Sequence, residues 1–248
     1  MKKDKFKVGL LTTINAPLLP FYISALISQG IRDLYVICDS KLESEKDLNI
    51  WFERTGGAFE RVDGGNVSIY HLESLMIPFY FVTSHNHQST LNIIENRKIK
   101  CLLNAGTPRK LSKNVIQATK HGVLNIHPGI LPEYRGCTAV EWAILNDDKV
   151  GNTAHFMVKD YDAGPIITSE WYEFPTDADY RSIRVRVYRD GCILAGKAMR
   201  VISEKRITQK DAIIQDESRA KYWNPIPEIK MKQVVDKLKN GNYKYQSL

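Results

Sequence analysis

The feature that most constrains the fold is a repeated alternation of short apolar runs and longer amphipathic segments over the first two-thirds of the chain. The apolar runs have strand length and cover residues 5–13, 33–40, 80–84, 99–106 and 123–127. Helical patterns lie between them, over residues 17–31, 45–57, 87–97 and 112–122. Repeated strand–helix–strand units of this length predict a mostly parallel sheet with helices on both faces, which is an α/β fold.

Two of the predicted helices carry more specific expectations. The helix over residues 45–57 is amphipathic and places Leu48, Trp51 and Phe52 on one face. For the helix over residues 112–122 we expect Ser112 to be the N-cap and Gly122 to mark the end.

The pattern changes after residue 136. A helix over 139–147 is followed by two strands around the tight link "DYDAGP" (160–165) and by a long helix over about 178–202. Two prolines precede a last helix, which Gly241 would end. We therefore expect a catalytic domain over residues 1–205 and a C-terminal extension over residues 206–248 that ends in a helix.

Composition excludes several classes of protein. Hydrophobic residues make up 43% and charged residues 25% of the 248 residues, as in ordinary soluble globular proteins. No apolar stretch is long enough for a membrane span, and "MKKDKFKVGLL" is better explained as a first strand than as a secretion leader. The four cysteines lie far apart, which suggests free thiols in a cytoplasmic protein. His85 and His87 have metal-like spacing but no evident third ligand, so no metal site is predicted.

A formal net charge of +7 invites a nucleic-acid hypothesis. The basic residues are spread along the chain, and no nucleic-acid-binding motif accompanies them. Such a diffuse excess favours small anionic substrates over a nucleic-acid partner.

The segment "VLNIHPGILPEYRG" (123–136) carries the first candidate chemistry. Strand alternation places Asn125 and His127 on the same face, and Pro128 then stops the ladder. This pair stands at the carboxyl end of a strand, where open α/β sheets bind their ligands. Taken alone, Asn125 is better explained as a turn cap and His127 as a satisfied histidine at a strand end.

A second anchor is Asp162, which precedes Ala163, Gly164 and Pro165. Taken alone, it is a typical turn aspartate. Together with Asn125 and His127 it suits acyl transfer. The amide and the imidazolium can donate to a tetrahedral oxyanion, the imidazole can manage a proton, and a carboxylate can hold the ring.

With "AVEWAI" and "GNTAHFMVKDYDAGPIITSE", these motifs resemble the core of the folate-dependent formyltransferases, most strongly over residues 80–175. The resemblance implies a Rossmann-like formyltransferase fold and 10-formyltetrahydrofolate as the formyl donor. It also implies that Asn125, His127 and Asp162 form the catalytic triad.

Matching segments at 102–108 and 157–162 imply folate contacts at Asn104, Gly106 and Asp160. His155, on a neighbouring strand, is either part of the site or a core histidine.

The acceptor is expected to be a nucleotide-linked amino sugar, for glycan biosynthesis. Glycinamide ribonucleotide enzymes have a glycine-rich phosphate loop after the first strand, whereas this chain has no glycine between Gly9 and Gly30. Methionyl-tRNA enzymes add a basic barrel, and the deformylase adds an N-terminal regulatory domain. The tail "AKYWNPIPEIKMKQVV" (220–235) resembles that of sugar-nucleotide N-formyltransferases.

Candidate acceptor contacts are Tyr134, Arg135 and Trp223, each of which a packing role would explain equally well. Formylation of glycinamide ribonucleotide or of an amino acid derivative, and deformylation of formyltetrahydrofolate, stay open as alternatives. Apolar residues of the tail suit a homodimer seam or packing on the parent domain.

Overall fold

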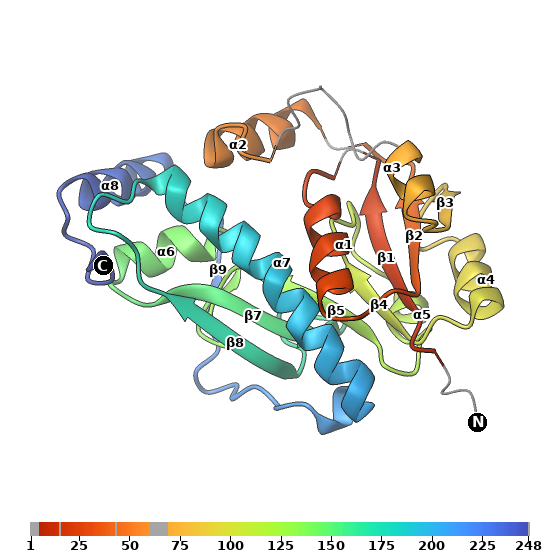
Figure 1. The fold of residues 1–248 in the computed structure, drawn as a ribbon. Helices are drawn as coiled ribbons and strands as arrows, with labels where there is room; N and C mark the ends of the chain where they lie inside the picture. The colour runs from red at the N-terminus through yellow and green to blue at the C-terminus, as the bar shows by residue number, and fades with distance from the viewer. Residues whose placement is uncertain (1–4, 15, 43, 60–68, 248) are drawn as a thin grey trace.

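A computed structural model describes residues 5–14, 16–42, 44–59 and 69–247 (Figure 1). In the first part of the chain, strands and helices alternate as β1 (Val8–Thr13), α1 (Leu19–Ser28), β2 (Leu34–Asp39), α2 (Glu45–Thr55), α3 (Ile69–Ser74), β3 (Phe79–Val82), α4 (Gln88–Arg97), β4 (Cys101–Asn104), α5 (Lys113–Ile116) and β5 (Val123–His127). The rest comprises β6 (Arg135–Gly136), α6 (Ala139–Leu145), β7 (Val150–Phe156), β8 (Ile166–Tyr172), α7 (Tyr180–Lys205), the 3-10 turn η1 (Gln209–Asp211), β9 (Tyr222–Trp223) and α8 (Glu228–Lys239).

Seven strands form one sheet in the order β3-β2-β1-β4-β5-β7-β8. The first five of these run parallel, whereas β7 is antiparallel to β5 and β8 is antiparallel to β7. The predicted mostly parallel sheet is therefore confirmed. Because β7 is antiparallel to β5, the turn between β7 and β8 begins beside Val123 at the amino end of β5, and Asp162 in this turn reaches back to His127.

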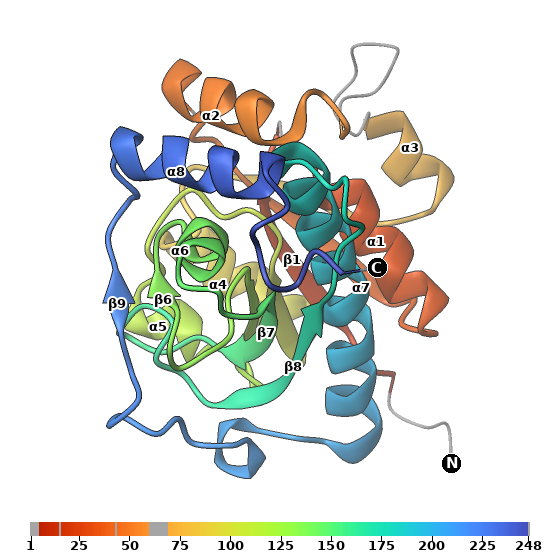
Figure 2. The same cartoon turned by 90° about the vertical axis from the view of Figure 1, so that its left-hand side faces the viewer.

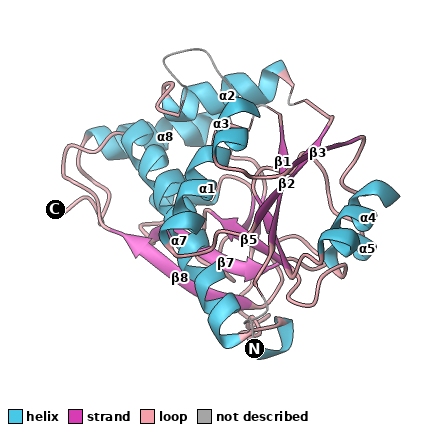
Figure 3. Ribbon diagram, turned by 45° about the vertical axis from the view of Figure 1, so that its right-hand side comes forward, coloured by secondary structure: helices cyan, strands magenta, loops and turns pink. Residues whose placement is uncertain are grey.

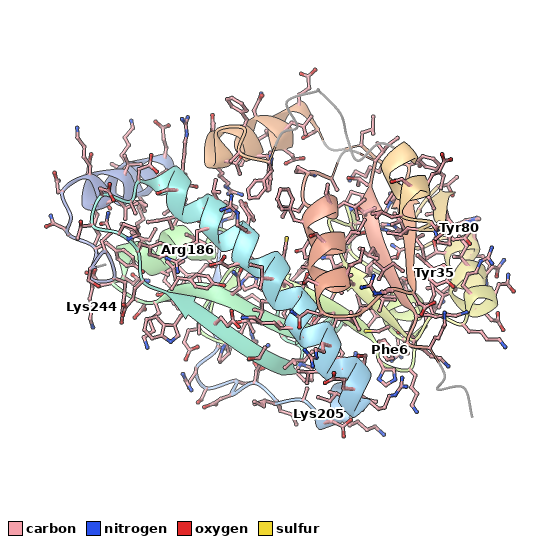
Figure 4. The ribbon with its side chains drawn as sticks, viewed as in Figure 1. Phe6, Tyr35, Tyr80, Arg186, Lys205 and Lys244 are labelled. Atoms are coloured by element: carbon pink, nitrogen blue, oxygen red, sulfur yellow. The ribbon has the colours of Figure 1, made fainter. Side chains whose placement is uncertain are left out.

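Helices cover both faces of the sheet, because successive strand side chains point to opposite sides (Figure 3). On one face Leu10 and Leu103 pack in a core with residues of α1 and α7. On the other face Leu11 and Leu102 pack with residues of α4 and α5. Near the amino end of α7, Arg186 lies over the rings of Tyr172 and Phe174 (Figure 4).

The C-terminal segment is part of this architecture (Figure 2). Its strand β9 pairs in parallel with β6, almost ninety residues earlier in the chain. Helix α8 buries Val234 and Leu238 in a third core, together with α6 and the first turns of α7.

The structure corrects two helix predictions. The helix predicted over 112–122 is only the single turn α5, where Ser112 makes no side-chain cap and Gly122 (φ +71°) lies in the turn that leads to β5. On α2, Leu48 and Phe52 of the expected apolar face are exposed. Only Trp51 of that face packs, against Phe59 and against Tyr188 of α7, because α2 lies against α7 and not on the sheet.

No helix in the described ranges is long and apolar enough to cross a membrane.

Candidate active site

The antiparallel pairing of β5 with β7 assembles the centre of the site. In this register Asn125 faces His155 and His127 faces Thr153. The sequence alone does not decide whether His155 belongs to the site or to the core, and the structure brings it beside Asn125 and His127. Only the strand register could have revealed this, because the two histidines lie far apart in the sequence.

Asp162 reaches the same point from the turn between β7 and β8. Its Oδ1 lies 3.4 Å from Nδ1 of His127, and its Oδ2 accepts a 2.9 Å hydrogen bond from the backbone N–H of Gly136. The turn that carries it requires a glycine, since a Cβ on Gly164 would stand 1.7 Å from the carbonyl oxygen of Phe156. The structure therefore brings the three predicted triad residues together.

The neighbours of His127 fix which ring nitrogen faces Asp162. Its Nε2 lies 2.6 Å from the carbonyl oxygen of Tyr134, which can only accept, so Nε2 carries a hydrogen. The ring is almost fully buried and cannot turn away from this bond. Nδ1 is therefore the nitrogen that can exchange a proton in the site.

A directed chain of hydrogen bonds orients the Asn125 amide. Backbone N–H groups of Gly106 and Thr107 donate to Oδ1 of Asn104, and Nδ2 of Asn104 donates to Oδ1 of Asn125 at 2.8 Å. Nδ2 of Asn125 lies 3.0 Å from Nε2 of His155.

His155 terminates this chain. Its Nδ1 lies 3.0 Å from the carbonyl oxygen of Phe156, so Nδ1 carries the hydrogen and Nε2 is left to accept from Asn125. Burial lowers the pKa of His155 to about 4, although the carboxylate of Asp162 acts in the opposite direction. The ring is therefore neutral, and its 3.7 Å approach to Asp162 is not an ion pair at neutral pH. One N–H of the Asn125 amide remains for a ligand.

A cavity of about 330 Å³, the Asn125 cavity, opens beside these groups. It is lined by Asn125, His155 and Asp162, and by the loops over residues 107–111 and 157–161. Asn104 and Asp160, both predicted to contact folate, also line it. Gly106 (φ +101°) does not; it makes the turn whose N–H orients Asn104.

Two further cavities continue from this one. The Tyr222 cavity, of about 420 Å³, shares Asp162 with the Asn125 cavity. The α2 cavity, of about 660 Å³, lies along α2 and shares Cys137 with the Tyr222 cavity.

An ion pair between a buried carboxylate and a partly exposed arginine holds the loop that lines the Asn125 cavity. Arg109 donates to both carboxylate oxygens of Asp39, at the end of β2. Burial alone would raise the pKa of Asp39, but the hydrogen bonds from Arg109 and from two backbone N–H groups hold this pKa below its usual range. Nε2 of His85 donates to the carbonyl oxygen of Ile37, and its Nδ1 accepts from the hydroxyl of Thr107.

The three predicted acceptor contacts do not line the cavities described above, and their role in acceptor binding stays a prediction. The Tyr134 ring stacks on Trp223 with centroids 5.6 Å apart, and the Trp223 indole donates to the carbonyl of Glu133. Arg135 is 1% exposed, and its guanidinium is taken up by Gln215 and Glu217. These contacts depend on the pairing of β6 with β9, which local sequence does not reveal.

Among the described residues, no group of three or more His, Cys, Asp or Glu side chains could hold a metal ion.

Comparison with known proteins finds relatives similar in sequence and solved structures similar in fold. The methionyl-tRNA formyltransferase of Alkaliphilus oremlandii is 29% identical over 147 residues, which cover 59% of this chain and 46% of that protein. The chain thus spans less than half the length of this curated relative.

Solved structures are similar over most of the chain. The sugar N-formyltransferase of Shewanella sp. FDAARGOS_354 has a TM-score of 0.61 at 13% identity, covering 94% of this chain and 87% of that one. Glycinamide ribonucleotide transformylase 1 of Symbiobacterium toebii has a TM-score of 0.60 at 19% identity, covering 86% and 96%. Residues 83–191, which include all of the residues that line the Asn125 cavity, match the formyl transferase family.

Proposed function

We propose, because residues 83–191 constitute a formyl transferase domain, that the protein moves a formyl group from 10-formyltetrahydrofolate to the amine of a nucleotide-linked amino sugar. The resemblance drawn from the sequence is confirmed at the level of this domain, and the solved structures confirm the fold. The observation that carries the proposal is the convergence of Asn125, His127 and Asp162 beside a small-molecule cavity.

The Asn125 cavity fits the flat heteroaromatic head of a reduced folate. Its volume lies within the ~300–1,000 Å³ typical of small-molecule sites. Apolar side chains, among them Leu111, Ile116 and Met157, line it together with polar groups of the two loops. When bound there, the folate supplies an activated formyl group.

Asn125 and His127 would then act on that group as donor and proton carrier. The amine lone pair of the acceptor forms a bond to the formyl carbon, and the free N–H of Asn125 donates to the oxygen as negative charge develops. Nδ1 of His127, held against Asp162, takes the proton that the amine loses and returns it to the departing nitrogen. A neutral His155 keeps the Asn125 amide turned with its N–H toward the cavity.

The α2 cavity supports this class of acceptor. The α2 cavity has the size of a small-molecule site and connects with Asp162 through the Tyr222 cavity. The net charge of +7 favours an anionic acceptor such as a nucleoside diphosphate derivative.

A methionyl-tRNA acceptor is the second candidate, favoured by the similarity to methionyl-tRNA formyltransferases.

One incubation series tests these alternatives. The protein is mixed with 10-formyltetrahydrofolate and, separately, with a panel of amino-sugar nucleotides, glycinamide ribonucleotide, methionyl-tRNA, or no acceptor. Mass spectrometry then detects a new formamide, and absorbance follows the released tetrahydrofolate. A formamide on an amino-sugar nucleotide supports the proposal. Product only on methionyl-tRNA or glycinamide ribonucleotide, or folate release without any acceptor, would replace it by that activity.

A further inference from the structure

The wall of the α2 cavity contains charged groups that the triad chemistry does not use. Trp51 and Arg54 of α2 line the cavity on one side, and Thr138, just before α6, lines it on the other. Behind them, Glu141 of α6 and Arg184 of α7 are buried to within 3% exposure of their side chains.

This wall carries more positive than negative charge. Glu141 lies 3.8 Å from Arg184 and 3.9 Å from Arg54, and the hydroxyl of Tyr180 donates to it at 2.6 Å. Burial would raise the pKa of Glu141, but the charges of Arg184 and Arg54 outweigh it and hold this pKa below the usual range. Two guanidinium groups thus share one carboxylate, and in the part of the chain that the structure describes neither arginine has another acidic partner.

Unpaired hydrogen-bond donors in the same wall also favour the binding of an anion. The indole N–H of Trp51 and the Nε–H of Arg184 are buried without an acceptor among the described residues, and Oε2 of Glu141 is the one buried acceptor of this group without a hydrogen-bond donor there, so unpaired donors outnumber unpaired acceptors. Buried donors without a partner are costly, whereas an anion offers several acceptor oxygens at once. Arg54 is the member of the group that is open to the cavity, with 27% of its side chain exposed.

The usual place for a phosphate on such a sheet does not suit one in this chain. The segment after β1 lacks glycine, and the N-cap residue of α1, Leu18, offers no side-chain cap. Because the segment between β1 and α1 has no glycine, its side chains keep the backbone N–H groups from a close approach to an anion.

We propose that Arg54, supported by Arg184 and Glu141, forms the subsite for a phosphate or diphosphate group of the acceptor in the α2 cavity. This assignment rests on the proposed transfer to an amine. It places the anion on α2, α6 and α7, away from the loop that follows β1. A planar guanidinium with free N–H groups binds phosphate oxygens in pairs, so lysine in its place would serve less well.

The thiol of Cys137 allows phosphate binding to be measured without an assay of formyl transfer. It is exposed and lines the α2 cavity, whereas Cys38, Cys101 and Cys192 are buried and burial raises the pKa of each thiol. A thiol reagent therefore reports on Cys137. Its alkylation rate is measured against rising uridine diphosphate and, separately, ribose 5-phosphate.

The variants compared are Arg54→Gln, Arg54→Lys and, as a control of equal charge change on the exposed side of α2, Lys46→Gln. We expect a phosphate compound to protect Cys137 in the unaltered protein and in Lys46→Gln. Arg54→Gln should bind it about 10- to 100-fold more weakly, and Arg54→Lys should fall between. Protection by uridine diphosphate alone assigns a nucleoside diphosphate, and protection by ribose 5-phosphate assigns a sugar monophosphate.

Absence of protection by either compound at millimolar concentration overturns the inference, as does unchanged protection in Arg54→Gln. Thermal stabilisation by 10-formyltetrahydrofolate is measured on the same samples. Folate binding without phosphate protection removes the subsite and leaves formyl transfer standing. Arg54-dependent protection without folate binding or transfer removes the proposed function and leaves the anion site.

Discussion

At the scale of single residues, the two histidines of the site differ in their hydrogen-bond partners. His127 has one nitrogen bound to a carbonyl and the other turned to Asp162, whereas His155 is neutral and only orients Asn125. The proposed proton carrier and the ring that orients Asn125 thus differ in their hydrogen-bond partners.

Replacement of the triad residues should abolish turnover without unfolding the protein. Asn125→Ala, His127→Ala and Asp162→Asn are each expected to lower kcat by about 100- to 10,000-fold, the range for loss of an oxyanion donor or an acid–base group. Formamide formation and melting temperature are measured together. His87→Ala, at the exposed cap of α4, is the matched histidine control. Near-normal rates in all three variants would place the chemistry elsewhere.

The buried neutral His155 should make stability depend on pH. Its pKa in the folded protein is about 4, below the value near 6.5 expected of an unfolded chain. Between these values only the unfolded state binds the proton, so the free energy of unfolding falls as pH decreases from about 6.5 toward 4. We expect His155 to contribute a loss of about 2 kcal/mol on going from pH 7 to pH 5.

Urea unfolding at the two pH values measures this loss in the natural protein and in His155→Gln, whose amide can still accept from Asn125. The variant should lose correspondingly less stability at low pH. An equal loss in both proteins would show that His155 is not the titrating group.

At the scale of elements, the turn between β7 and β8 decides whether Asp162 reaches His127. A Cβ at Gly164 would collide with the backbone of Phe156, so Gly164→Ala must displace the turn. We expect it to destabilise the fold by more than about 2 kcal/mol and to reduce turnover at least tenfold.

Gly30→Ala provides the comparison. Gly30 also has a positive φ, but nothing lies within 4 Å of the position of its Cβ. This variant should cost only about 1 kcal/mol and leave kcat unchanged. Equal effects of the two substitutions would mean that backbone strain, and not the collision at Phe156, controls the turn.

Periodicity predicted the elements better than their contacts. The strands from β1 to β5 and the pair Asn125 and His127 followed from alternation, because burial of a parallel strand leaves a strong local pattern. The addition of His155 depended on strand register. The packing of Trp223 against Tyr134 depended on pairing between distant segments, and no local pattern encodes either contact.

At the scale of the whole molecule, the segment after residue 205 shares a core with the rest. Leu238 of α8 is 3% exposed and packs in the cluster that contains residues of α6 and α7. The division into residues 1–205 and 206–248 stays a prediction about organisation, and the packing suggests that both parts unfold together.

Leu238→Ala tests that cooperativity. The lost packing should lower the free energy of unfolding by about 3 kcal/mol, in one transition seen alike by circular dichroism and tryptophan fluorescence. Val235→Ala, on the exposed side of the same helix, should cost less than about 1 kcal/mol. A separate early transition confined to Leu238→Ala would instead identify an independently unfolding extension.

The arrangement of the cavities bears on the order of events in catalysis. The Asn125 cavity and the α2 cavity have Pro108 in common and otherwise different linings. The Tyr222 cavity adjoins both, because it shares Asp162 with the first and Cys137 with the second. In the proposed reaction each substrate would therefore occupy its own cavity, and no side chain would carry the formyl group in between. We expect transfer within a ternary complex, with sequential and not ping-pong kinetics.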